Sequence, residues 1–326
     1  MKKTSMKSSL TLLLTAVIWG VAFVAQSVGM DYVEPFTFSF TRCILGGLVL
    51  IPCIALMDRQ KGKQEREREK TGGSVNTENA ACLNGAAEQE KNCKDKAERR
   101  TLLAGGVCCG IALCVASNLQ QIGIQYTSVG KAGFITALYI VLVPVIEIFL
   151  GKKSGIRTWI SVVIAVAGLY LLCITDGFSI GTGDILILLC ALAFSVHILV
   201  IDYFSPKVDG VRMSCIQFFV CGILSGIAML IFETPSVGAV MQAWLPIGYA
   251  GILSCGVAYT LQIIGQKGTD PTVASLILSL ESVVSVLSGW LILHQSLSRK
   301  ELLGCVLMFL AIILVQLPQK ETGTEH

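Results

Sequence analysis

Charged residues are scarce in this sequence, in which only 14% of the 326 residues are Asp, Glu, Lys or Arg. Soluble globular chains carry about 25% charged residues. The shortage is uneven, because segment 58–100 alone holds 11 of the 25 Lys and Arg and 9 of the 22 Asp and Glu. The rest is almost bare apolar sequence, and the mean hydropathy of +0.71 describes a chain suited to a lipid bilayer. The net charge of +3 is small and spread out, so it gives no indication of a nucleic-acid partner.

Motifs for nucleotide binding and metal-dependent hydrolysis are also missing. No P-loop, HExxH or GxGxxG element occurs, and the three histidines are scattered. A GxSxG pattern occurs once, at residues 177–181, in a connection between two apolar runs rather than between a strand and a helix. Eleven of the 13 cysteines lie inside apolar stretches, where cysteine acts as a small hydrophobe. The other two, Cys82 and Cys93, lack the CxxC spacing or nearby histidine of a zinc site. We therefore expect no enzyme activity, no cofactor and no metal site.

Ten apolar runs of 18 or more residues are present, each close to the ~20 residues that cross ~30 Å of hydrocarbon as a helix. They cover residues 10–30, 35–57, 102–124, 130–150, 156–175, 183–202, 211–232, 242–264, 271–293 and 298–317. Most connections between them are short, so neighbouring helices must run antiparallel. The predicted fold class is an all-α integral membrane protein of ten transmembrane helices.

Lys and Arg are distributed unevenly between the two sets of connections. Outside segment 58–100, ten lie on the side of the N-terminus and three on the other side. Because cytoplasmic loops carry the excess of positive residues, we expect a protein of the cell (cytoplasmic) membrane with both termini in the cytoplasm. Segment 58–100 is then cytoplasmic, and its mixed charges with almost no branched apolar residues predict disorder.

The sequence repeats itself. Residues 115–132 match residues 257–274 at an offset of 142, with eight of 18 pairs identical, where chance would give about two. The first two helices match the sixth and seventh more weakly at an offset of 175, as Ser39 matches Ser214. The chain therefore divides into two halves of five helices, residues 8–175 and 183–317. Because five is odd, the second half enters the membrane from the opposite side, and such inverted repeats are typical of secondary transporters.

Several short motifs accompany this repeat. They are Trp19-Gly20, Arg42, residues 125–128 (QYTS) followed by Ala132 and Phe134, Pro144, and residues 274–283 (ASLILSLESV). Together with the repeat they resemble the drug/metabolite transporter superfamily, specifically its EamA-type ten-helix permeases, over residues 8–317. The resemblance implies that helices 1–4 and 6–9 line a central cavity for a small metabolite or drug, with helices 5 and 10 outside. Ser282 departs from the family pattern, because proline often follows the helix 9 glutamate there.

Ionisable residues inside a span are costly, about 3 kcal/mol or more at its centre, so each needs a function or a partner. Glu281, about ten residues into the ninth helix, either binds a substrate ammonium, carries a proton, or pairs structurally with a neighbouring helix. Tyr139 occupies the corresponding position in the first half. Arg42 either attracts a carboxylate or phosphate, pairs with Glu281, or extends to the membrane interface. His197 either relays protons or is a hydrogen-bonded core residue.

Uncharged polar residues recur at helical spacing within the repeated segments. Asn118 and Gln121 lie on the third helix, and Tyr259 and Gln262 have the same spacing on the eighth. Such side chains either line a wet cavity or join neighbouring helices, and their presence in both repeats favours the cavity. The candidate residues for substrate binding or coupling are therefore Trp19, Arg42, Asn118, Gln121, Tyr139, His197, Tyr259, Gln262 and Glu281.

These features predict a secondary transporter that alternates access around Glu281 and Arg42. The expected partners are a small-molecule substrate, amino acid-like or another small polar metabolite, the lipid bilayer, and protons as the candidate coupling ion. Two other classes stay open. An intramembrane enzyme acting on lipid-linked substrates would need clustered His, Asp or Glu near one interface, and a non-transporting scaffold would use segment 58–100 for docking.

The predicted topology can be tested with introduced cysteines and a membrane-impermeant maleimide. We expect cysteines at Asp31 and Glu233 to be labelled from outside intact cells, above the background of the parent protein. Cysteines at Lys207 and Lys267 should be labelled only after permeabilisation. Labelling of both sets from the same side would contradict the inverted repeat.

Overall fold

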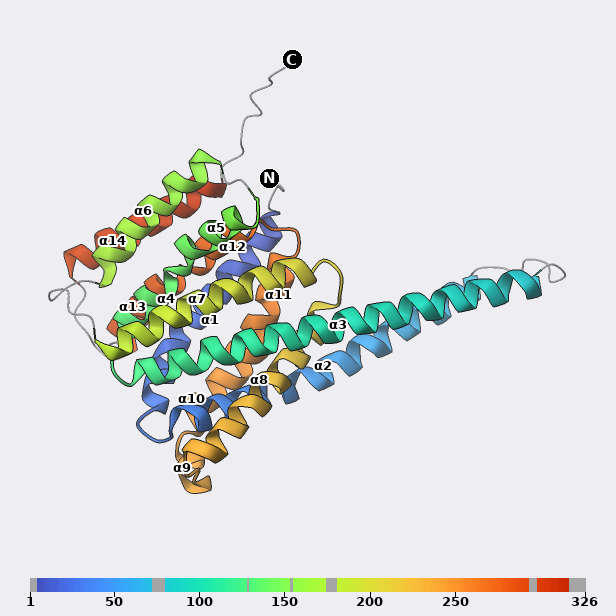
Figure 1. Ribbon diagram of the computed structural model, residues 1–326, viewed down its shortest axis with the longest axis horizontal. Helices are drawn as coiled ribbons and strands as arrows, with labels where there is room; N and C mark the ends of the chain where they lie inside the picture. The colour runs from blue at the N-terminus through green and yellow to red at the C-terminus, as the bar shows by residue number, and fades with distance from the viewer. Residues whose placement is uncertain are drawn as a thin grey trace, which may run out of the picture.

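The structure, a computed structural model, describes residues 5–71, 80–127, 129–152, 155–173, 181–292 and 298–316. All regular secondary structure in these residues is helical (Figure 1). The elements are α1 (Met6–Gly29), α2 (Pro35–Thr71), α3 (Ala80–Ile124), α4 (Val129–Ala137), α5 (Tyr139–Phe149), α6 (Ile156–Cys173), α7 (Thr182–Phe204), α8 (Gly210–Phe232), α9 (Val237–Gln242), α10 (Trp244–Gly248), the π-helix η1 (Tyr249–Tyr259), α11 (Thr260–Gln266), α12 (Pro271–Leu278), α13 (Glu281–Ile292) and α14 (Arg299–Gln316).

Eight helical segments of the described chain are long and apolar enough to cross a membrane. They are Met6–Gly29, Pro35–Gln64, Lys96–Ile124, Ala132–Phe149, Thr182–Phe204, Gly210–Phe232, Trp244–Gln266 and Pro271–Ile292. The apolar parts of α6 and α14 are shorter, Ile156–Gly168 and Leu302–Val315. Eight of the ten predicted spans are therefore helices of the length and apolar composition that a membrane crossing needs, and the crossing of the membrane by α6 and α14 stays a prediction.

The structure differs from the sequence-based expectation in segment 58–100. Helix α2 continues to Thr71 and α3 already begins at Ala80, so the described parts of this segment are helical rather than disordered. Figure 1 shows the two helices leaving the bundle together as a long arm. The segment is rich in Glu, Lys, Arg and Gln, which have high helix propensity, and each helix continues from an apolar span that has already nucleated it. Low hydrophobicity was thus a poor indicator of backbone conformation here.

Helices of the two halves pack mainly against each other. Helix α3 packs against α7 and α8, α2 packs against α8 and η1, and α1 packs against α11, η1 and α13. Helices α6 and α14 form a separate pair at one edge of the bundle (Figure 1). The interface between the halves therefore runs through the centre of the bundle.

The outer surface of the bundle is apolar. On α3, Val107, Ile111 and Val115 follow one another at intervals of four residues and all have exposed side chains. Residues four apart lie on the same helix face, so this face is a continuous apolar stripe. Such a surface is suited to contact with lipid chains.

Two of the membrane-spanning segments are interrupted at corresponding positions. The segment Ala132–Phe149 changes from α4 to α5 at Leu138, and the segment Pro271–Ile292 changes from α12 to α13 at Ser279 and Leu280. At both places the backbone tightens, because Leu138 N–H donates to the Ile135 carbonyl and Leu280 N–H to the Ile277 carbonyl, each at 3.2 Å. Leu138 and Leu280 are 142 residues apart, which is the offset of the repeat.

Neither interruption lies at a proline. Pro144 is inside α5, beyond the break at Leu138. At the break between α12 and α13, where Ser282 follows Glu281, two serine hydroxyls donate hydrogen bonds to main-chain carbonyls. Ser279 Oγ donates to the Leu276 carbonyl at 2.7 Å, and Ser282 Oγ donates to the Gly133 carbonyl of α4 at 2.9 Å. A serine hydroxyl that bonds a backbone carbonyl of the preceding turn, as that of Ser279 does, often bends a helix, and this bond lies at a break that has no proline.

Helices α1 and α13 approach each other closely at Gly20. A Cβ atom at this position would lie 2.4 Å from Val284 Cβ and 2.7 Å from the Glu281 carbonyl oxygen. Real Cβ contacts are not this short, so a side chain at position 20 would push the two helices apart.

We therefore expect Gly20→Ala to lower the free energy of unfolding by about 1–3 kcal/mol, the usual range for overpacking a helix contact. The measurement is thermal unfolding of the purified protein in detergent. Gly248→Ala is the matched control, because nothing lies within 4 Å of a Cβ placed there. Equal melting temperatures for the two variants would contradict this packing of α1 against α13.

Candidate functional site

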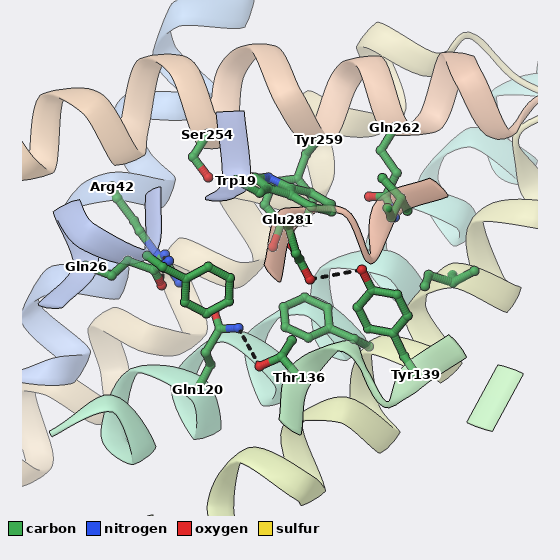
Figure 2. A pocket seen from close by; sticks show the side chains of 14 residues that line it. Trp19, Gln26, Arg42, Gln120, Thr136, Tyr139, Ser254, Tyr259, Gln262 and Glu281 are labelled. Atoms are coloured by element: carbon green, nitrogen blue, oxygen red, sulfur yellow. Dashed lines mark hydrogen bonds between the residues drawn. The ribbon is translucent and has the colours of Figure 1, made fainter. Parts of the chain in front are cut away.

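A cavity lies between the two halves of the chain (Figure 2). It is lined by Trp19, Phe23 and Gln26 of α1, Arg42 of α2, Gln120 of α3, Thr136 of α4, Tyr139 of α5, Phe194 and Ile198 of α7, Ser254 and Tyr259 of η1, Gln262 of α11, Leu278 of α12 and Glu281 of α13. Polar, charged and aromatic side chains make up most of this lining, although the outer surface of the bundle is apolar.

A hydrogen bond between the two interrupted spans crosses the cavity wall. Tyr139 is the first residue of α5 and Glu281 the first residue of α13, so each follows a helix break. The Tyr139 hydroxyl donates to Glu281 Oε1 at 2.9 Å (Figure 2). Both side chains are buried, with 3% and 4% of their surface exposed. The break positions therefore bring the two corresponding residues of the halves into direct contact.

Arg42 supplies a positive charge to the same cavity. Its Nη1 donates to Gln26 Oε1 at 2.9 Å, and its guanidinium carbon lies 5.6 Å from the centre of the Phe38 ring. No hydrogen bond or ion pair joins Arg42 to Glu281 among the described residues. The two charged residues line one cavity but have different partners.

Aromatic and amide side chains complete the walls. The Trp19 and Tyr259 rings lie 4.5 Å apart between centroids, at an angle of 58°. Gln120 Nε2 donates to Thr136 Oγ1 at 3.3 Å. The indole N–H of Trp19 and the Oε1 atom of Gln262 are buried and lack a partner among the described residues. Unpaired buried polar atoms are rare in proteins, so this lining retains hydrogen-bonding capacity for a guest.

Six of the nine candidate residues from the sequence line the cavity, namely Trp19, Arg42, Tyr139, Tyr259, Gln262 and Glu281. The other three lie beside it and bond to neighbouring helices. Asn118 Nδ2 donates to Ser225 Oγ at 2.8 Å, and Gln121 Nε2 donates to the Gln26 carbonyl at 3.2 Å. His197 Nε2 lies 3.2 Å from Gln217 Oε1, and its ring lies 6.0 Å from that of Tyr259 between centroids. These three contacts fit side chains that join helices and support the cavity wall.

Lining residues that sequence reasoning missed include Gln120, Thr136 and Phe194. For Gln120 and Phe194 a signal was present in the repeat. Gln120 pairs with Gln262 at the offset of 142, and Phe194 pairs with Trp19 at the offset of 175. Applying the two offsets to each candidate residue would have found these partners.

A second polar cluster lies apart from the residues that line the cavity, where α5, α7 and α12 meet. Lys152 Nζ donates to Glu147 Oε1 at 3.0 Å and to Asp202 Oδ2 at 3.3 Å. Thr272 Oγ1 donates to the other oxygen of Glu147, Oε2, at 2.7 Å. Glu147 is only 2% exposed. The cluster joins the two halves at the ends of three spans.

No group of three or more His, Cys, Asp or Glu side chains in the described part of the chain is arranged to hold a metal ion. The site is built from hydrogen-bonding, aromatic and two charged side chains. Such a lining suits reversible binding of a small polar solute.

Comparison with known proteins gives consistent results. The EamA-like transporter family matches residues 6–75, 85–174 and 181–317. An uncharacterized transporter of Archaeoglobus fulgidus is 28% identical over 311 residues, which cover 95% of this chain and 86% of that protein. The uncharacterized transporter YoaV of Bacillus subtilis is 22% identical over 314 residues, which cover 94% of this chain and 96% of that protein.

A solved crystal structure of another protein has a similar fold. It superposes with a TM-score of 0.69 at 19% sequence identity, over 96% of this chain and 98% of that one. The family match extends over nearly the whole length of the chain, as do the alignments with both transporters. The chain therefore belongs to the EamA-like transporter family.

Proposed function

We propose that this protein is a gradient-driven secondary transporter that moves a small polar solute across the cytoplasmic membrane by alternating access. In this proposal the chain crosses the membrane ten times, as two inverted five-helix repeats, with both termini in the cytoplasm. The cavity around Glu281 and Tyr139 is the binding site through which the solute passes.

One observation carries this proposal, namely the composition of the cavity wall. Ten of the 14 lining residues form five pairs related by the offsets of the sequence repeat. The pairs are Trp19 with Phe194, Phe23 with Ile198, Gln120 with Gln262, Thr136 with Leu278, and Tyr139 with Glu281. In an inverted repeat the symmetry axis lies in the membrane plane, so paired residues surround a point that both sides can reach equally. A symmetric cavity of this kind is what alternating access requires.

Helix packing supports the same symmetry. The contact of α3 with α7 has its counterpart in the contacts of α1 with η1 and α11. The contact of α3 with α8 likewise corresponds to that of α2 with η1. If the two halves exchange these packing arrangements, the protein has two states of similar energy that open to opposite sides.

The cluster around Glu147 supports closure on one side. By the predicted topology Glu147, Lys152, Asp202 and Thr272 all lie near the cytoplasmic ends of their spans. Their hydrogen bonds tie together α5, α7 and α12, which come from both halves. We infer that this cluster is the cytoplasmic gate, closed in this conformation, and that it must open to release or admit solute on that side.

Glu281 is the proposed coupling or binding group. Replacing it by Gln keeps the shape and removes only the charge. We expect Glu281→Gln to reduce gradient-driven flux about tenfold or more, because a buried carboxylate hydrogen bond contributes about 1.5–3 kcal/mol. The measurement is flux in proteoliposomes, with a solute found by a thermal-shift screen of metabolites on the purified protein.

Comparing driven flux with exchange separates the two roles of Glu281. If Glu281 carries the coupling proton, exchange without a gradient persists while the pH gradient no longer drives uptake. If Glu281 binds a solute amine directly, exchange and binding are lost together. Asp31→Asn, an acid-to-amide change at an exposed position, is the matched control. Wild-type driven flux in Glu281→Gln would show that Glu281 is structural and would contradict the proposed site.

A further inference from the structure

Arg42 is a buried cation whose contacts are with neutral groups. Only 5% of its surface is exposed. Its Nη1 donates to the amide oxygen of Gln26, its guanidinium faces the ring of Phe38, and its Nε has no hydrogen-bond partner among the described residues. A guanidinium stays protonated in proteins. Arg42 is therefore a positive charge without a counter-charge in the described part of the bundle.

The one carboxylate among the residues that line the cavity has a different partner. Glu281 Oε1 accepts its hydrogen bond from Tyr139, and no ion pair links it to Arg42 in the described structure. Figure 2 shows Arg42, Gln26 and Ser254 together toward one end of the cavity, with Tyr139 and Gln262 toward the other. A buried charge without a partner is unfavourable, so the bundle retains Arg42 at a cost in stability.

The surroundings of Arg42 are also the part of the cavity that the repeat does not explain. Four lining residues have no counterpart in the wall, namely Gln26, Arg42, Ser254 and Tyr259. At the offset of 175, the counterpart of Arg42 is Gln217, which bonds His197 instead of lining the cavity. The repeat therefore does not account for the polar residues around Arg42. The ten paired residues suit the passage of a solute, and the four unpaired ones suit its recognition.

We propose that Arg42, with Gln26 and Ser254, forms a subsite that binds an anionic group, a carboxylate or a phosphate, of the transported solute. The guanidinium has a free Nε–H and a planar array of donors that fits two oxygens of such a group. Ser254 adds a hydroxyl on the same side of the cavity. The anion would supply the missing counter-charge. That the solute is transported rests on the proposed function, whereas binding of its anionic group does not.

Trp19 offers a direct readout, because it lines the same cavity and its fluorescence reports which solutes reach it. The other three tryptophans, Trp159, Trp244 and Trp290, are replaced by Phe to leave Trp19 as the one emitter. Trp244 and Trp290 are exposed and Trp159 is half-buried, so none of the three is part of the cavity wall. Iodide, a small anion, and acrylamide, a neutral molecule, serve as quenchers of the purified protein.

We expect Arg42→Gln to reduce iodide quenching of Trp19 about fivefold, because it removes the attracting charge, and to leave acrylamide quenching unchanged. Arg42→Lys should retain most of the iodide quenching. Arg212→Gln is the matched control, since Arg212 pairs with Asp58 and its side chain is 42% exposed. Iodide quenching equal to that of the parent in Arg42→Gln, or no iodide quenching in the parent, would overturn the subsite.

Competition in the parent protein decides the question even if Arg42→Gln does not fold. Acetate and inorganic phosphate should each protect Trp19 from iodide, and the stronger of the two identifies the class of anion. Acetamide, which has the shape of acetate without its charge, should not protect. Equal effects of acetate and acetamide would overturn the subsite. If acetate and phosphate protect Trp19 but no flux is found, only the transport proposal is refuted. If flux is found but these anions do not protect Trp19, only the subsite is refuted.

Discussion

The hydrogen bond between Tyr139 and Glu281 is the contact on which the arrangement of the site depends. A carboxyl group inside a bilayer needs a partner, and in the described structure that partner is the corresponding residue of the other half. Both residues are placed by helix breaks at Leu138 and at Ser279 and Leu280. The breaks turn the beginnings of α5 and α13 toward each other, and the cavity forms around their meeting point.

Close helix packing makes this meeting possible. At Gly20 the backbone of α1 lies directly against the carbonyl of Glu281 and the side chain of Val284. In a bilayer, apolar side chains gain little from leaving lipid, so helices associate through close van der Waals packing and interhelical hydrogen bonds. Small residues at such crossings therefore hold the walls of a polar cavity in place, although they take no part in its chemistry.

Symmetry and asymmetry divide the site into two parts. Paired residues such as Gln120 and Gln262 give both halves a similar share of the wall, which suits a solute that arrives from one side and leaves by the other. Arg42 and Ser254 belong to one half each and have no partner across the cavity. A transporter needs the first feature to alternate and the second to discriminate. The Glu147 cluster adds a third element, a polar contact between halves at one end of the spans.

Much of the architecture was predictable from the sequence, because a run of apolar residues is enough to indicate a membrane-crossing helix. Eight predicted spans coincide with helices long enough to cross a membrane, and six of nine candidate residues line one cavity. The differences between the sequence-based expectation and the structure have physical causes. The helical arm at residues 58–71 and 80–100 was taken as disordered because composition reports burial rather than helix propensity. Asn118 and Gln121 share the spacing of Tyr259 and Gln262, yet their side chains bond to other helices.

The sequence by itself determined the membrane class, the positions of eight apolar helices, the sequence repeat and the pairing of position 139 with position 281. Each of these follows from periodicity and spacing along one chain. Only the tertiary structure decided which face of each helix meets the cavity, that Glu281 bonds Tyr139 rather than Arg42, and that Arg42 has no counter-charge among the described residues. Those outcomes depend on the rotation and crossing of helices from opposite halves, and in lipid these are set by close packing rather than by hydrophobicity. Hydropathy records that a residue is inside the membrane, and packing alone determines what it touches there.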